Sequence, residues 1–149
     1  MPDNHGPREP RTPQPDSQTH DNGEDLHSGH LGLAEAVQLA EIVAPDFILV
    51  SGCVLRRTQY DPANLEEWQS VAGGDIPQIE YLVNHLHLWD YLAPSNEAEE
   101  RALERLAGKI AISWELHARR QFPERRFVAE VTNDYGPTVA VFQGETPPL

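Results

Sequence analysis

Residues Lys109–Gln143 read KIAISWELHARRQFPERRFVAEVTNDYGPTVAVFQ, and this stretch determines the fold that the sequence predicts. Apolar residues alternate with other residues in three successive segments, Lys109–Arg120, Arg125–Thr132 and Thr138–Gln143. A period of two residues is typical of β-strands. The motif NDYGP between the last two segments tolerates positive φ angles and suits a hairpin turn. We therefore predict an antiparallel meander of three strands.

Four other segments complete the predicted set of elements. Leu31–Val43 has apolar residues at helical spacing, so we predict a short amphipathic helix. Phe47–Arg57 is rich in β-branched residues, which favours a strand. Pro77–Leu92 fits a helix as well as a strand, and its aromatic content leads us to predict a strand. Asn96–Ala107 begins with a capping residue and acids and is followed by Gly108, so we predict a helix that stops there.

Together these elements predict an α+β fold, with an antiparallel four- to five-stranded sheet and one or two short helices. They form a single domain over residues 31–149. The preceding segment, Met1–His30, is acidic, rich in proline and free of aromatic residues. Such a segment cannot bury enough apolar surface to offset the entropy of ordering it, so we predict a disordered N-terminal tail.

The formal net charge of −13 bears on partners and location. An acidic surface repels nucleic acid and anionic lipid, so we expect no nucleic-acid partner.

No run approaches the ~20 apolar residues of a membrane helix, and we expect no membrane insertion and a soluble, cytoplasmic protein. The single cysteine, Cys53, excludes an internal disulfide and lies in an apolar run, where a small buried side chain is expected.

Few residues suggest chemistry. On a strand His85 and His87 would face the same way, and His117 on a neighbouring strand could complete a three-histidine metal site. Since no diagnostic spacing or cysteine pair supports such a site, we expect no metal, no cofactor and no catalytic residue. The pair Arg56-Arg57 falls at the end of a predicted strand, where we expect it to solvate the edge.

Both faces of the predicted sheet carry apolar residues, which predicts contact with a partner, a ligand or another subunit. The order of the elements resembles the SecB family of protein-export chaperones, including the shorter SecB-like type associated with toxin–antitoxin systems. The second half of the meander is similar to the family pattern FxxEVxxxGxFxI at Phe127, Glu130, Val131, Gly136, Val139 and Val141. The chain departs from the family in the helix Asn96–Ala107 and in stopping at Leu149, before the strand and long helix that complete SecB proteins.

This resemblance implies a holdase chaperone with a role in protein transport. It would be a homo-oligomer that binds unfolded or partner polypeptides through apolar sheet surfaces, without nucleotide. The client-binding residues expected on this basis are aromatic: Tyr81, Trp89, Tyr91, Trp114 and Phe142.

Two alternatives remain open from the residues alone. One is a small α+β cone of the cystatin-like or nuclear-transport-factor-like type, which would bind a small ligand or metal in a pocket lined by His85, His87 and His117. The other is an immunity or antitoxin-type protein whose acidic surface neutralises a basic toxin.

Overall fold

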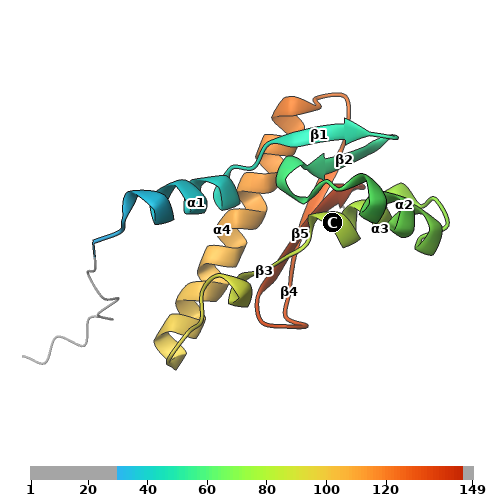
Figure 1. Ribbon diagram of the computed structural model, residues 1–149. Coiled ribbons are helices and arrows are strands. Elements are labelled where there is room, and N and C mark those ends of the chain that lie inside the picture. The colour runs from blue at the N-terminus through green and yellow to red at the C-terminus, as the bar shows by residue number, and fades with distance from the viewer. Residues whose placement is uncertain (1–29, 146–149) are drawn as a thin grey trace, which may run out of the picture.

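The computed structural model describes residues 30–145 (Figure 1). The predicted tail, Met1–His30, lies outside this range except for its last residue. In chain order the described residues form α1 (Leu33–Val43), β1 (Phe47–Val50), β2 (Cys53–Arg56), the 3-10 helix η1 (Arg57–Gln59), α2 (Pro62–Val71), α3 (Ile76–Asn84), β3 (Leu86–His87), the 3-10 helix η2 (Leu88–Asp90), α4 (Glu97–Gln121), β4 (Phe127–Thr132) and β5 (Thr138–Gln143). Within this range none of the helices has the length and apolar character needed to cross a lipid bilayer.

The fold class is α+β, as predicted, but the strands form two small antiparallel sheets instead of one sheet of four or five strands. β1 pairs with β2 as a hairpin, while β5 lies between β3 and β4. The predicted strands Arg125–Thr132 and Thr138–Gln143 are confirmed as β4 and β5. The prediction of one or two short helices is wrong, because the described residues contain four α-helices, one of them 25 residues long.

The predicted strand Lys109–Arg120 is also wrong, because these residues form the second half of α4. The alternation was misleading for a specific reason. Ile112 and Leu116 are exposed, and they fall between residues that a helix buries at its own spacing of three and four. The buried residues of α4 are Leu103, Ala107, Ile110, Ala111, Trp114 and Ala118.

The start of α4 agrees with the prediction, whereas Gly108 does not end the helix. The side chain of Asn96 accepts a hydrogen bond from the backbone N–H of Glu99 at 2.9 Å. Acids in the first turn, and Arg119 and Arg120 in the last, complement the helix dipole. A glycine inside a helix costs about 1 kcal/mol relative to alanine. Burial of the large ring of Trp114 beyond Gly108 outweighs that cost.

The segment Phe47–Arg57 is a hairpin and not one strand. Val50 pairs with Cys53 across Ser51 and Gly52, and these two central residues have φ angles of 51° and 81°. Positive φ at both positions is a property of the type I′ turn, which matches the twist of paired strands. A Ser-Gly pair between two short apolar runs is a general turn signal in the sequence.

The strand predicted for Pro77–Leu92 is correct only at Leu86–His87, which pairs with β5. Most of the segment belongs to α3, which the alternative helical interpretation describes. Asp75 caps this helix by accepting a hydrogen bond from the backbone N–H of Gln78 at 3.3 Å. The other helix predicted in this half of the chain, Leu31–Val43, is confirmed as α1.

The core lies where α4 crosses the three-stranded sheet, and α3 contacts both β2 and β5 (Figure 1). Trp114 and Phe127 are the largest fully buried side chains of this main core. A second cluster joins β2, α2 and α3, and it contains Cys53, Leu55, Leu65 and Ile79. Cys53 is therefore a buried apolar residue, as predicted, and burial raises the pKa of its thiol.

Candidate functional site

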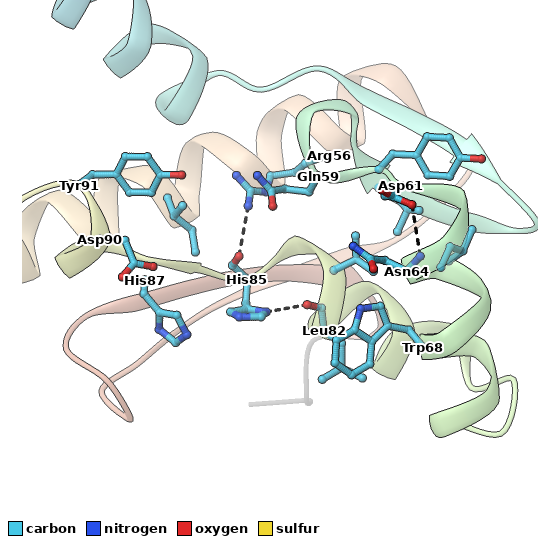
Figure 2. Close-up of a pocket in the computed structure, with 15 residues that line it drawn as sticks. Arg56, Gln59, Asp61, Asn64, Trp68, Leu82, His85, His87, Asp90 and Tyr91 are labelled. Carbon is cyan, nitrogen blue, oxygen red and sulfur yellow. Dashed lines mark hydrogen bonds between the residues drawn. The ribbon is translucent and has the colours of Figure 1, made fainter.

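A pocket of about 280 Å³ lies between the end of β2, the helices α2 and α3, and the segment that leads from α3 to α4. Figure 2 shows its polar side chains converging from these elements, with Arg56 between Tyr91 and the start of α2. We call it the Arg56 pocket. It is lined by Leu55, Arg56, Gln59, Tyr60, Asp61, Asn64, Leu65, Trp68, Leu82, Val83, His85, Leu86, His87, Asp90 and Tyr91.

Arg56 is the buried charge of this pocket, with 3% of its surface exposed. Its guanidinium lies over the ring of Trp114, 4.5 Å from the centroid, and its Nη2 donates a hydrogen bond to the carbonyl oxygen of His85 at 3.2 Å. Its Nε has no hydrogen-bond partner. Among the described residues no carboxylate forms an ion pair with it. Hydrogen-bonding capacity and a positive charge are therefore left for a ligand.

The pKa of Arg56 is consistent with a buried charge that has no ion-pair partner. Burial lowers its pKa from the ordinary value to about 10, an effect that Tyr91 partly opposes. The guanidinium therefore stays protonated at neutral pH, although no anion neutralises it. Burying a charge without a partner costs several kcal/mol, so an anionic group that enters the pocket would recover part of this free energy.

His85 and His87 stand side by side in the pocket, with ring centroids 4.9 Å apart. The Nδ1 of His85 lies 2.6 Å from the carbonyl oxygen of Leu82. Since a carbonyl oxygen only accepts, this Nδ1 carries the proton. The Nδ1 of His87 donates to the hydroxyl of Thr138 at 2.7 Å, because that hydroxyl itself donates to the carbonyl oxygen of Gly136. With Nδ1 used as the donor, Nε2 is the second ring nitrogen of each imidazole that can form a hydrogen bond with a ligand.

Two carboxylates also line the pocket, on either side of Arg56 in Figure 2. Asp61 caps α2, where its side chain accepts hydrogen bonds from the backbone N–H groups of Ala63 and Asn64. Asp90 is exposed at the rim. The formal charge of Arg56 together with these carboxylates is negative, so the pocket disfavours a ligand that carries two or more negative charges.

A buried polar seam holds the backbone of Arg56 in place. Asn84 accepts a hydrogen bond from the backbone N–H of Arg56 at 2.8 Å, and its amide donates to the carbonyl oxygens of Val54 and Val141 at 2.9 and 3.0 Å. It thereby connects β2 with β5, which do not pair directly. We call Asn84 and Glu80, with these partners, the α3 seam.

Glu80 makes the same connection one helical turn earlier. Its carboxylate is fully buried and accepts hydrogen bonds from the backbone N–H of Val54 at 2.6 Å and from that of Gln143 at 2.5 Å. The side-chain amide of Gln143 donates a third bond at 2.5 Å. Burial raises the pKa of Glu80, and the bonds from Gln143 and Val54 oppose this only in part. Its hydrogen bonds to both sheets make this acid a structural residue.

The three histidines proposed as metal ligands do not come together. His117 lies on α4, where its Nδ1 donates to the carbonyl oxygen of Ser113 at 2.7 Å, and it does not line the Arg56 pocket. Within residues 30–145, no group of three potential metal ligands is close enough to hold an ion.

The aromatic residues expected to bind clients occupy different environments. Trp114 is fully buried in the main core. Tyr81 and Phe142 are half-buried and pack edge to face, with centroids 6.0 Å apart. Trp89 and Tyr91 are each 44% exposed, and Tyr91 lines the Arg56 pocket.

The residues expected from the sequence include His85, His87 and Tyr91 of this pocket, but not Arg56 and Asn84, on which the site depends. The expectation that Arg56 solvates a strand edge is wrong, since all four residues of β2 are buried and no alternation marks the fourth. Asn84 carried a usable signal. On the helical interpretation of α3 it lies one turn after Glu80 and beside the apolar stripe, which predicts a buried polar pair.

No protein-family model matches the chain, and no curated protein and no solved structure is significantly similar to it.

Proposed function

We propose that this protein is a binding protein for a small organic carboxylate, held in the Arg56 pocket. One observation carries the proposal: Arg56 is buried and charged, yet no carboxylate of the described residues pairs with it. A planar guanidinium donates two parallel hydrogen bonds to a carboxylate, which makes arginine well suited to recognise this group.

The other residues of the pocket narrow the ligand class. Asp61 and Asp90 flank the guanidinium and would attract an ammonium group. Trp68, Leu65 and Leu82 offer an apolar wall. A volume of about 280 Å³ is suited to a ligand of roughly amino-acid size, since the pockets that bind drug-sized molecules have volumes of about 300–1,000 Å³. We infer a zwitterion, such as an α-amino acid with an apolar side chain.

The composition of the pocket is suited to binding. Its fifteen lining residues include no serine, threonine, cysteine or lysine, and its aspartates, histidines and tyrosines, which can also act as nucleophiles, can hold a ligand by charge and hydrogen bonds. Cys53 is buried in the second core cluster and is not among them. The two imidazoles can form hydrogen bonds with a ligand through Nε2, so the site has the groups for recognition.

The direct test is thermal unfolding of the full chain with individual L-amino acids, short monocarboxylates and inorganic phosphate. A ligand at one hundred times its Kd stabilises the folded state by about 2.7 kcal/mol, which gives a measurable rise in Tm. We expect the largest rise with an apolar amino acid. We expect none with phosphate, because Asp61 and Asp90 repel a dianion.

Two variants control this measurement. Arg56→Met should abolish the response, and Arg56→Lys should weaken it, because lysine keeps the charge but loses the planar pair of donors. The proposal is wrong if no carboxylate raises the Tm, or if Arg56→Met responds like the unmodified protein.

Binding of non-native polypeptides is a second candidate function. It is supported by exposed aromatic residues in the segment between α3 and α4. Trp89, Tyr91 and Leu92 are 44%, 44% and 43% exposed along one segment. Leu92 also lines a separate cleft of about 320 Å³ with Ala93, Pro94, Glu99, Ala102, Leu103 and Leu106. A largely apolar cleft beside exposed aromatic rings could hold an extended chain through its side chains.

Suppression of the aggregation of an unrelated unfolded protein, without nucleotide, tests this candidate. We expect the double variant Trp89→Ser, Leu92→Ser to lose suppression, while Arg56→Met retains it. No suppression by the unmodified protein in stoichiometric excess would eliminate the chaperone function and leave carboxylate binding untouched.

A further inference from the structure

The outward face of α4 carries two exposed aliphatic residues flanked by basic ones. Ile112 and Leu116 lie one helical turn apart and are 64% and 60% exposed. Lys109 precedes Ile112 by three residues and Arg120 follows Leu116 by four, so both bases share this face. Both are exposed. On a chain with a net charge of −13, this face is locally apolar and basic.

The first helix provides a second apolar surface without a partner. α1 buries none of its residues. Leu33 and Val37 lie one turn apart and are 82% and 51% exposed. Figure 1 shows most of this helix projecting away from the rest of the protein. Because an isolated helix of eleven residues is marginally stable in water, a partner surface would stabilise it.

Only the C-terminal end of α1 is fixed to the body. The hydroxyl of Ser113 donates to the carbonyl oxygen of Val43 at 2.6 Å, and the indole N–H of Trp114 donates to that of Ile42 at 2.7 Å. These bonds set the direction of α1 and leave its first two turns exposed.

The charges of the two helices are complementary. α1 contains no basic residue, and Glu41 follows Val37 by four residues, so it lies on the face of Leu33 and Val37, whereas Glu35 lies on the opposite face. The face around Ile112 and Leu116 is basic at both ends, where Lys109 and Arg120 lie. The one acid at its flank, Glu115, is already paired with Arg119.

We propose that two copies of this chain form a dimer in which α1 of each copy packs on the outward face of α4 in the other. Twofold symmetry makes both contacts at once, and each contact joins an acidic apolar helix to a basic apolar one. A second copy is the occupant that these charges favour, because one chain carries both complementary surfaces. The proposal is independent of the function of the Arg56 pocket.

The small size of the two surfaces sets the strength of association. Each contact buries only four large aliphatic side chains, two from each copy, and association must first overcome the loss of translational and rotational freedom. We therefore expect a dissociation constant on the order of micromolar.

Charge reversal combined with sedimentation velocity tests the dimer. The unmodified full chain should change from monomer to dimer between about 1 and about 200 µM. The variants E41R and K109E/R120E should each dimerise at least tenfold more weakly, because both contacts then join like charges. An equimolar mixture of the two variants should dimerise about as well as the unmodified protein, because both contacts again join opposite charges.

Circular dichroism and urea unfolding of each variant alone identify any misfolded protein, and restoration in the mixture also requires both variants to be folded. A chain that stays monomeric at about 200 µM would overturn the proposal. Variants that dimerise normally alone, or a mixture that fails to restore the dimer when both are folded, would overturn it as well.

Discussion

Two buried polar regions meet at Arg56, and they differ in how completely their groups are partnered. In the α3 seam, Glu80 and Asn84 each make three hydrogen bonds that connect β2 with β5. In the Arg56 pocket, a guanidinium that is equally buried makes one hydrogen bond and one ring contact. A folded protein keeps a costly, incompletely partnered charge where something other than stability requires it. The seam therefore serves the fold, whereas the pocket retains hydrogen-bonding capacity and a charge that the proposed ligand would satisfy.

The largest effect is expected from breaking the seam at Asn84. Asn84→Ala leaves the backbone N–H of Arg56 and the carbonyl oxygens of Val54 and Val141 buried without partners. The free energy of unfolding should fall by about 3–5 kcal/mol, which urea denaturation measures. Asn64→Ala is the matched control: its side chain is exposed, and its stability should stay within about 0.5 kcal/mol of the unmodified protein. A loss below about 1 kcal/mol for Asn84→Ala would remove the distinction between the two regions.

The next effect is the pH dependence that Glu80 contributes. Its pKa is raised above the ordinary value of 4.5, so the folded state holds the proton more tightly than the unfolded chain does. Its contribution to stability is therefore complete below pH 4.5 and is lost as the pH rises through the folded-state pKa. In Glu80→Gln this titration is absent, and the amide N–H₂ faces the backbone donor of Gln143.

The measurement is the difference in unfolding free energy between the unmodified protein and Glu80→Gln from acidic to neutral pH. The advantage of the unmodified protein should be greatest below pH 4.5 and decrease as the pH rises. The difference cancels the titration of the other carboxylates, which both proteins share. An advantage that grows with pH would mean that the pKa of Glu80 is lowered.

How much of this the sequence could predict depends on whether the signals were local. The β4–β5 hairpin follows from alternation around NDYGP, and the N-terminus of α4 follows from Asn96 and the acids after it. The extent of α4 was missed because exposed Ile112 and Leu116 completed a false two-residue period. Gly108 predicts a helix stop, but core burial beyond it keeps the helix continuous.

The candidate site was harder to predict than the fold, because it depends on contacts distant in sequence. The side chain of Asn84 forms a hydrogen bond with Val141, which is 57 residues away, and no local sequence pattern predicts that bond. The burial of Arg56 results from packing on Trp114, whose own position required the helix that was predicted as a strand. His85 and His87 were identified from a two-residue spacing, but their hydrogen-bond partners follow only from the fold.

A smaller effect on stability is expected at the centre of the pocket, although Arg56 is as buried as Asn84. Burial lowers the pKa of Arg56 to about 10, so the protonated form is disfavoured in the folded state by roughly 3 kcal/mol at neutral pH. Arg56→Met removes this cost together with one hydrogen bond and the contact with Trp114. Its unfolding free energy should stay within about 1 kcal/mol of the unmodified protein while carboxylate binding is lost. A decrease of more than about 3 kcal/mol would make Arg56 a structural residue like Asn84.

The smallest effect on stability is expected for Asp90→Asn at the rim of the pocket. This substitution changes the charge that a ligand meets and leaves the folding free energy almost unchanged. Asp90 is exposed, so the unfolding free energy should change by less than about 0.5 kcal/mol. Removing one negative charge near Arg56 should strengthen the binding of dicarboxylates roughly fivefold, because a unit charge a few ångströms away contributes about 1 kcal/mol in a solvated site. Binding of zwitterionic amino acids should weaken, since their ammonium group loses an attractive partner. Calorimetric titration with succinate and with leucine measures the two changes, and parallel changes for both ligands would contradict the placement of the ammonium group beside Asp90.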